Sequence, residues 1–404
     1  MIVADFNKDG TADVATTGFS GVVLLLGLGN GTFTGTTNSS PAGRSLMATG
    51  DFNNDKNLDL MVLGDYGGSV LLGDGSGKFP VVTNSVFANY PAAVAIGDFN
   101  GDGKLDVATG DLSRAVKVAF GRGDGSFGTS TTCPLSNYVS DIRTGDLNGN
   151  GRLDLVVALR SASSTDSNTV CVLTNNGDGT FAAQRYYGGA PGGTEYQRSL
   201  ELADLKGDGA LDLVLLNREL DRDAGSVTIR LNSGAGVFGP PIDYSVGFAP
   251  SSIASADFNG DGNVDLIVRD NGVATVLLGH GDGSFTVSSQ MFVPSDSGRN
   301  HTVGVGDFNG DGMPDIAFLD SSGGAVAVML NKTPPLLKLT PMPGYNQLSW
   351  LTTFGAGYTL EYTTNLTVRS GWQAFPYPPV VVGNLKAVTD WDDQGRKFYR
   401  LRKP

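Results

Sequence analysis

The sequence predicts an all-β protein, a seven-bladed β-propeller followed by a small C-terminal β-sandwich, and three observations support this fold. A nine-residue, Asp-rich segment recurs seven times, with starts at Asp5, Asp51, Asp98, Asp146, Asp204, Asp257 and Asp307. Successive starts are separated by 46 to 58 residues, and a nearly constant period of this size indicates a repeat architecture. Short apolar runs of strand length flank every copy, and no apolar run with a helical period extends beyond a turn or two.

Each repeat has the same predicted order of strands. A short apolar strand such as 93–96 enters the Asp-rich loop, and a second strand such as 153–158 leaves it. A third strand such as 22–26 leads to a Gly-Asp-Gly-[Ser/Thr]-Phe turn, whose glycines favour a tight hairpin, and a weaker fourth strand follows. Four antiparallel strands per unit and seven units predict seven propeller blades. The phenylalanines that close the turns are the predicted packing anchors: Phe33, Phe79, Phe127, Phe181, Phe238 and Phe285.

The Asp-rich loops have the composition of a calcium-binding loop. Side-chain oxygens occupy positions 1, 3, 5 and 9, a turn-forming glycine occupies position 6, and position 7 varies freely, as expected for a backbone carbonyl ligand. Ca²⁺ takes six to eight oxygen ligands in a flexible shell, so we expect these loops to bind it. The predicted ligands are Asp5, Asn7, Asp9, Thr11 and Asp13; Asp51, Asn53, Asp55, Asn57 and Asp59; Asp98, Asn100, Asp102, Lys104 and Asp106; Asp146, Asn148, Asn150, Arg152 and Asp154; Asp257, Asn259, Asp261, Asn263 and Asp265; and Asp307, Asn309, Asp311, Met313 and Asp315.

The seven copies are not equivalent. The loops that begin at Asp5, Asp98, Asp257 and Asp307 have the complete pattern, whereas the Asp51 loop has Lys56 at position 6 and the Asp146 loop has Asn150 at position 5. In the Asp204 loop, Lys206 replaces the oxygen ligand at position 3, and its ammonium group competes with a metal ion. We therefore expect about four to six bound Ca²⁺ ions, with the Asp204 loop empty. The loops also contain many of the Asp residues that give the chain its net charge of −13.

Together these repeats resemble FG-GAP/VCBS repeats, which form the N-terminal propeller of integrin alpha subunits and occur in many secreted bacterial proteins. The resemblance covers residues 1–332. It implies a calcium-stabilised, extracellular or cell-surface binding or adhesion module that recognises a glycan or protein ligand as a monomer and without catalysis. Two alternatives remain open: a polysaccharide-acting enzyme, lyase or hydrolase, on a propeller scaffold, and a purely structural spacer.

The repeat pattern ends at residue 332. Residues 333–335 read Thr-Pro-Pro, a linker signal, and residues 336–404 have strand patterning without Asp-rich loops. The segments 347–350 and 398–401 of this region resemble the small fibronectin type III-like sandwich that ends many secreted bacterial proteins. In the seventh repeat no Phe-closed turn follows the third strand, 325–330. We therefore expect blade 7 to be short, or to be completed by residues 334–341 or by a docked face of the C-terminal sandwich.

The ligand-binding site is predicted in the segments where the repeat is longer than usual, since loops on a rigid scaffold often carry function. The two longest intervals follow the Asp146 and Asp204 starts, and the extra residues fall within 160–169, 183–198 and 217–226. In integrin-like propellers such links lie on the face opposite the calcium loops. The candidate ligand-binding residues are Arg185, Tyr186, Tyr187, Glu195, Tyr196, Arg198, Arg218, Glu219 and Arg222. Neutral drift in surface loops is the alternative interpretation.

Other sequence features restrict the function classes. No basic patch is present, so nucleic acid is not an expected partner, and no apolar run is long enough to cross a membrane as a helix. No signal peptide is recognisable, and because the chain opens inside a repeat, we expect a truncated N-terminus of a secreted or surface protein. The histidines His280 and His301, which an enzyme could use, have no evident partner. Cys133 and Cys171 either pair across neighbouring blades or remain two buried thiols.

Overall fold

The computed structural model contains β-strands and no helix in the part of the chain that it describes. The described residues are 1–18, 21–38, 46–64, 67–85, 91–111, 113–160, 168–182, 185–188, 195–219, 224–248, 250–270, 272–293, 302–320, 325–332, 338–342, 345–351, 359–363, 373–376, 378–382, 385–390 and 397–402. Within these ranges, nothing forms a helix long and apolar enough to cross a membrane. The predicted all-β class is confirmed.

Six four-stranded antiparallel sheets form the first six blades. Blade 1 contains β1 (Ile2–Ala4), β2 (Asp13–Gly18), β3 (Gly21–Gly27) and β4 (Phe33–Asn38). Blade 2 contains β5 (Leu46–Gly50), β6 (Asp59–Gly64), β7 (Gly67–Leu72) and β8 (Val81–Ser85). Blade 3 contains β9 (Ala93–Gly97), β10 (Asp106–Gly110), β11 (Ala115–Gly121) and β12 (Phe127–Pro134).

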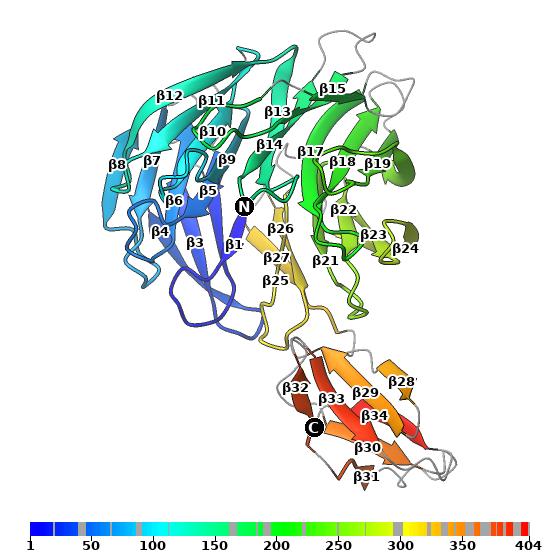
Figure 1. Cartoon of the computed structure of the whole chain (residues 1–404). Coiled ribbons are helices and arrows are strands. Elements are labelled where there is room, and N and C mark those ends of the chain that lie inside the picture. The colour runs from blue at the N-terminus through cyan, green and yellow to red at the C-terminus, as the bar shows by residue number, and fades with distance from the viewer. Residues whose placement is uncertain are drawn as a thin grey trace.

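The next three blades repeat this order. Blade 4 contains β13 (Tyr138–Gly145), β14 (Asp154–Arg160), β15 (Asn168–Leu173) and β16 (Arg185–Gly188). Blade 5 contains β17 (Glu195–Ala203), β18 (Asp212–Glu219), β19 (Ala224–Arg230) and β20 (Ile242–Phe248). Blade 6 contains β21 (Ser252–Ala256), β22 (Asp265–Arg269), β23 (Val273–Gly279) and β24 (Phe285–Phe292). In each blade the four strands lie in sequence order from the inside of the ring outward (Figure 1).

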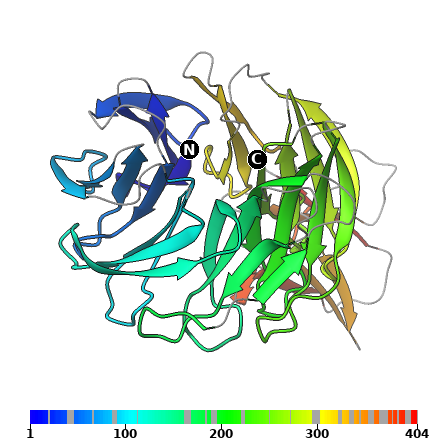
Figure 2. The ribbon, with the colours of Figure 1, turned by 90° about the horizontal axis from the view of Figure 1, so that it is seen from above.

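The blades form a closed ring. The first strand of every blade contacts the first strands of both neighbouring blades, and β1 of blade 1 contacts the first strand of blade 7. The first strands therefore surround the axis, as Figure 2 shows from above. The second strands are buried on both faces because each lies between two blades: every residue of β6, β10 and β22 is buried. This explains why the interior positions of these strands are mostly apolar and do not alternate, although each strand begins with the buried Asp of its loop.

The hydrophobic core is a series of clusters, one between each pair of neighbouring blades. Leu60 and Phe79, for example, join the side chains of blade 1 in the cluster between blades 1 and 2. Another cluster combines Val14 of blade 1 with Phe308 and Ala317 of blade 7, so the ring is closed by the same kind of apolar contact. Blades that are adjacent in the sequence thus bury each other's faces, and blades 1 and 7 do the same where the ring closes.

Blade 7 contains three strands in the described residues: β25 (Val303–Gly306), β26 (Asp315–Asp320) and β27 (Ala325–Met329). The described part of blade 7 is short, as predicted. The alternative, completion by residues 334–341, fails for residues 338–341, and residues 334–337 lie outside the described residues. Within that segment, β28 (Lys338–Met342) pairs with the C-terminal strand β29 instead. At the seam, the rings of Phe33 and Phe308 meet edge to face at 5.7 Å, and the backbone N–H of Gly31 donates to the Phe308 carbonyl at 2.8 Å.

The C-terminal region forms two further small sheets, apart from the blades in Figure 1. One contains β28, β29 (Tyr345–Leu351), β33 (Leu385–Asp390) and β32 (Val380–Val382). The other contains β31 (Gln373–Ala374), β30 (Thr359–Thr363) and β34 (Phe398–Arg402). Leu348 and Val388 of the first sheet and Leu360 of the second share one small core. Its likeness to a fibronectin type III domain stays a prediction, and the linker 333–335 lies outside the described residues.

Replacing Phe308 by Ala is expected to destabilise the propeller by ~3–5 kcal/mol, because it leaves a cavity at the seam between blades 7 and 1. Phe308 is 1% exposed. Denaturant unfolding monitored by circular dichroism measures the change. Phe248→Ala is the control, since Phe248 is 71% exposed and should change stability by less than ~0.5 kcal/mol. Equal effects of the two substitutions would show that the seam is held by other contacts.

Candidate metal-binding loops

Each Asp-rich loop joins the first two strands of its blade and so lies at the same end of the ring. Its backbone is left-handed at two positions: Gly101 and Gly103, positions 4 and 6 of the Asp98 loop, have φ of 77° and 78°. The sequence pattern predicted a turn-forming residue only at position 6. Lys56 also has positive φ, 69°, as its place at position 6 predicted, and this strain costs roughly 1–2 kcal/mol in a residue with a side chain.

The first aspartate of each loop organises the turn. In the Asp98 loop, its carboxylate accepts the N–H groups of Gly101, Asp102 and Gly103 at 2.7, 3.2 and 2.8 Å. The same acceptor pattern, from the N–H groups of positions 5 and 6, recurs in the other six loops. Position 1 therefore satisfies backbone donors of the tight turn, whether or not a cation is bound.

The ninth residue of each loop is a buried aspartate that connects the loop to the third strand. In blade 3, Asp106 accepts the Phe99 N–H at 2.9 Å with one oxygen and the Gly121 N–H at 2.8 Å with the other. The equivalent aspartates of all seven loops make the same two bonds and are 0% exposed. From the sequence these residues were predicted to be metal ligands alone, and their bond to the end of the third strand was not predicted.

Burial raises the free-energy cost of ionising these carboxylates. It raises the pKa of Asp59, Asp106 and Asp265 to about 6, and the aspartates at positions 1 and 5 of the same loop add to the effect by repulsion. The backbone N–H groups act in the opposite direction by stabilising the charged form. A cation near positions 1, 5 and 9 would offset the remaining repulsion, so the charge balance of the loops fits a bound cation.

The donor set of the loops suits Ca²⁺, because it consists of carboxylate, amide and carbonyl oxygens in an order that lets alternate residues face one point. In their described geometry the loops contain no group of three Asp, Glu, His or Cys side chains arranged to hold a metal ion. Their carboxylates accept N–H groups, but each carboxylate oxygen has two acceptor sites. A cation can therefore be added without breaking these hydrogen bonds, although the carboxylates must move toward one another.

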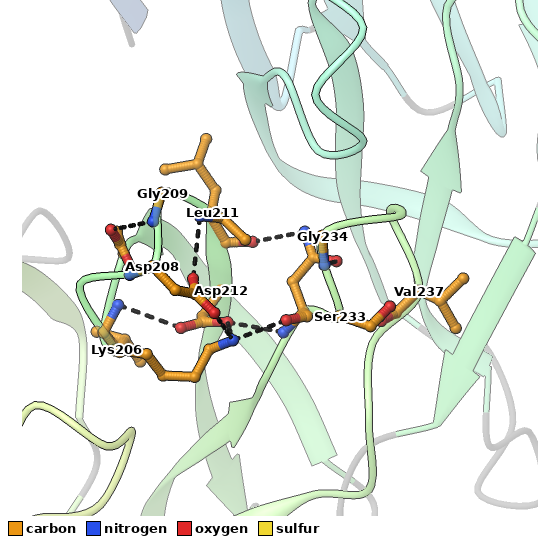
Figure 3. A network of polar contacts seen from close by, with 12 residues as sticks. Lys206, Asp208, Gly209, Leu211, Asp212, Ser233, Gly234 and Val237 are labelled. Atoms are coloured by element: carbon orange, nitrogen blue, oxygen red, sulfur yellow. Dashed lines mark hydrogen bonds and ion pairs between the residues drawn. The ribbon is translucent and has the colours of Figure 1, made fainter.

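The Asp204 loop holds an ammonium group among its acids (Figure 3). Lys206 Nζ lies 2.5 Å from an Asp208 oxygen and 3.8 Å from an Asp212 oxygen, and it donates to the Asn232 carbonyl at 2.9 Å. The hydrogen bond to Asp208 raises the pKa of Lys206, so it stays protonated. Lys206 thus forms ion pairs with two of the acids of its loop, whereas the Asp204 carboxylate accepts the N–H groups of Asp208 and Gly209.

The Phe-closed turns dock onto the loop of the preceding blade. The Gly125 N–H of blade 3 donates to the Phe52 carbonyl of blade 2 at 3.0 Å, and the rings of Phe52 and Phe127 meet edge to face at 6.1 Å. Similar ring pairs hold Phe79 on Phe6 and Phe181 on Phe99. The predicted role of the turn phenylalanines as packing anchors is confirmed. Blade 7 has no such turn in the described residues, and the Asn331 amide donates to the Phe258 carbonyl of blade 6 at 2.8 Å.

Three of the predicted ligand-binding residues lie in a strand and contact neighbouring blades. Tyr187 in β16 accepts the Phe238 N–H of blade 5 at 3.1 Å, and its ring meets the Phe238 ring at 5.5 Å. Tyr186 accepts the Ser136 N–H of blade 3 at 3.4 Å, and Arg185 donates to the Gly236 carbonyl at 3.4 Å. The range 183–198, in which extra residues were predicted, contains β16 and the start of β17 and is therefore not one continuous loop.

The structure brings four other candidates together at one end of blade 5. In the β17–β18 pair, Glu195 lies opposite Glu219, and Tyr196 lies opposite Arg218. The Asp204 loop joins the opposite ends of the same two strands, so this end is on the other face of the ring, as predicted. Arg198 lies at the register shift of β17, while Arg222 and His301 lie outside the described residues. His280 Nε2 is 2.8 Å from the Thr286 hydroxyl.

Replacing Asp106 by Asn is expected to lower the stability of metal-free protein by ~1–3 kcal/mol, because the amide nitrogen cannot accept the buried N–H group that the carboxylate accepts. Urea unfolding in excess chelator measures this loss without any metal contribution. Asp124→Asn is the control, since Asp124 lies in an exposed turn. If the two variants unfold at the same urea concentration, position 9 has no structural role apart from metal binding.

Replacing Lys206 by Asn is expected to add one bound Ca²⁺ per chain, since it removes the ammonium group and supplies the oxygen ligand that other loops have at position 3. Equilibrium dialysis followed by metal analysis counts the ions. Lys8→Asn is the matched control, because Lys8 lies at position 4 of its loop, which is not a ligand position. An unchanged ion count in the Lys206 variant would mean that something else keeps this loop empty.

Comparison with known proteins agrees with this geometry. FG-GAP-like repeats match residues 5–62, 51–109, 98–157, 204–268 and 257–318. Integrin alpha pat-2 of Caenorhabditis elegans and its counterpart in Caenorhabditis briggsae are each 28% identical over 177 residues, which covers 35% of this chain and 14% of each integrin. The chain thus spans a small part of the length of these relatives.

Two solved structures share the fold. An Agrocybe aegerita lectin, described for its specific recognition of non-reducing terminal N-acetylglucosamine, has a TM-score of 0.54 at 24% identity, covering 80% of this chain and 91% of the lectin. BBS1N, solved in complex with ARL6DN, has a TM-score of 0.50 at 12% identity, covering 82% of this chain and 91% of BBS1N. The repeat matches cover more than half of the chain and begin at its Asp-rich loops, so the chain belongs to the FG-GAP-like repeat family.

Proposed function

We propose that this chain is a calcium-stabilised binding module that acts outside the cell or on its surface, recognises a glycan or protein ligand and has no catalytic activity. The observation that carries the proposal is the loop repeated seven times on a family scaffold, in which oxygen donors occupy positions 1, 3, 5 and 9 in six of the copies. The likeness to integrin alpha supports a surface role. The fold shared with a lectin is compatible with a glycan ligand.

Calcium has a structural role in this proposal. The ions would be held by the oxygens of positions 1, 3, 5, 7 and 9 in the loops other than the Asp204 loop. The chemistry that the ion supplies is charge neutralisation, because each loop concentrates carboxylates around a buried aspartate. Free Ca²⁺ is abundant outside cells, where exposed loops of modest affinity can be filled, and this supports the proposed location.

The ligand is proposed to bind at the end of blade 5 opposite the Asp204 loop. The backbone register groups Glu195, Tyr196, Arg218 and Glu219 there. Tyr196 and Arg218 form a cross-strand pair at this end, and the combination of Tyr with Arg suits a sugar or a peptide, since both present hydroxyl or amide groups next to apolar surface. Strand β16 is a less suitable recognition site than this end, because its side chains already contact other parts of the ring: Arg185, Tyr186 and Tyr187.

Removing calcium is expected to lower the melting temperature, because ions that bind only the folded state stabilise it by RT ln(1 + [L]/Kd) for each site. Differential scanning calorimetry of protein with verified calcium content, before and after excess EDTA, measures the shift, and added Ca²⁺ should restore it. Mg²⁺ serves as the control for ionic strength. Identical melting curves with and without EDTA would refute the stabilising role.

Arg218→Ala is expected to weaken ligand binding by tenfold or more, because a hydrogen bond from a charged group contributes ~1.5–3 kcal/mol and the variant loses it. A glycan array and a panel of extracellular proteins identify the ligand, and isothermal titration calorimetry then compares the variants. Arg122→Ala, a change in an exposed turn on the loop face, is the control. Release of new reducing ends or unsaturated products from acidic polysaccharides would favour an enzyme, and no binding at all would favour a spacer.

A further inference from the structure

The only two cysteines of the chain lie in neighbouring blades and pack into the same hydrophobic cluster. Cys133 is in β12, the outermost strand of blade 3, and Cys171 is in β15, the third strand of blade 4. Both are free thiols. They are 38 positions apart in the sequence, so their closeness comes from the packing of one blade on the next.

The side chain of Cys133 faces blade 4. Along β12, Thr131 and Cys133 are half-buried, whereas Thr132 and Pro134 between and after them are exposed. The Thr131 hydroxyl donates to the Gly179 carbonyl of blade 4 at 3.0 Å. Because alternate residues of a strand point to the same side, Cys133 lies on the same face as this contact.

The side chain of Cys171 faces back toward blade 3. Cys171 pairs with Tyr186 across the β15–β16 ladder, so the two side chains are neighbours on one face of the sheet. The Tyr186 hydroxyl accepts the N–H of Ser136, which follows Cys133 by three residues. Tyr186 and Cys133 both pack against the cluster that contains Cys171.

The two sulfurs differ in access. Cys133 is half-buried and lines a cavity of about 450 Å³ between the blades, together with Thr131, Leu173 and Phe181. Cys171 is 0% exposed and does not line it. Burial raises the pKa of the Cys133 thiol, and it raises the pKa of Cys171 to about 12. Since the thiolate is the nucleophile, Cys133 reacts first and mildly alkaline pH favours the reaction.

We propose that Cys133 and Cys171 are a redox modification site, at which exchange with a small disulfide such as oxidised glutathione forms a covalent bond between blades 3 and 4. The Cys133 thiolate attacks one sulfur of the small disulfide, forms a mixed disulfide and releases one glutathione thiolate. The Cys171 thiol then gives up its proton and attacks the Cys133 sulfur, which expels the second glutathione as a thiolate that takes up a proton. The protein loses two hydrogens and two electrons, and one oxidised glutathione becomes two reduced molecules.

This site is separate from the calcium loops and from the proposed ligand site. Disulfides persist in oxidising environments outside the cytosol, so a surface or secreted location would favour the bonded form. The bond would cross the contact between two blades, which in the described residues is held by apolar packing, hydrogen bonds and the stacking of Arg114 on Tyr138. It would prevent these two blades from separating.

The test uses the whole chain, reduced and then incubated with oxidised glutathione at mildly alkaline pH. The expected product is a monomer that is lighter by two hydrogens, has no thiol for iodoacetamide after denaturation, and melts several degrees higher than the reduced protein. Digestion without reductant should give a single cross-linked pair of peptides, one with Cys133 and one with Cys171. Because the chain has no other cysteine, this result has one interpretation.

Two variants test the order of the steps. Cys171→Ser should stop at the mixed disulfide and gain the mass of one glutathionyl group, while Cys133→Ser should remain unmodified as long as it is folded. Circular dichroism checks that each variant is folded, and the wild-type mass measurement stands without them. The proposal is overturned if the wild type keeps two free thiols, carries only the mixed disulfide, or forms disulfide-linked dimers.

Discussion

Each blade depends on the two hydrogen bonds that the buried aspartate at position 9 accepts. Its two oxygens accept one N–H from the loop between the first and second strands and one N–H from the end of the third strand, as Asp265 does for Phe258 and Gly279 at 2.9 and 2.8 Å. A single side chain therefore fixes three strands relative to one another. Hydrogen bonds to a charged acceptor are stronger than those between neutral groups, which compensates part of the cost of burying the carboxylate.

The same loop then provides the surface on which the next blade docks. Its second residue, Phe in most copies, presents its carbonyl and its ring to the turn of the neighbouring blade, as Phe99 does for Gly179 and Phe181. An asparagine amide of the neighbouring blade also donates to this carbonyl, whether the residue is Phe or Leu: Asn175 donates to Phe99 at 3.0 Å and Asn232 donates to Leu147 at 2.8 Å. The Asp-rich loops thus organise both the interior of each blade and the contact between blades.

Most of this architecture could be predicted from the sequence because the repeat is regular. The loop positions, the strand order and the turn phenylalanines follow from spacing and turn chemistry. The second role of the ninth residue could not be predicted, because its partner at or just beyond the end of the third strand is 14 residues further on in one blade and 21 in another. Spacing also could not assign β28, since a short apolar strand such as this one can pair with the edge of blade 7 or with β29.

The candidate sites were predictable to different extents. The loop ligands follow from residue type and order, which are local properties. Tyr186 and Tyr187 were assigned to a variable link because β16 is short and Gly-rich segments flank it, yet their hydroxyls accept N–H groups from neighbouring blades. The pairing of Tyr196 with Arg218 depends on the register of two strands and on the shift between Gln197 and Ser199, which no local pattern specifies.

The closure between Phe33 and Phe308 has a consequence for how the repeats are stabilised. An open array of repeats exposes an apolar face at each end and needs terminal capping repeats with polar outer surfaces. In this ring the last blade covers the first, so every blade has two neighbours and no cap is needed. Blade 7 can therefore hold its place with three strands in the described residues, since both of its faces are covered by neighbours that are already complete.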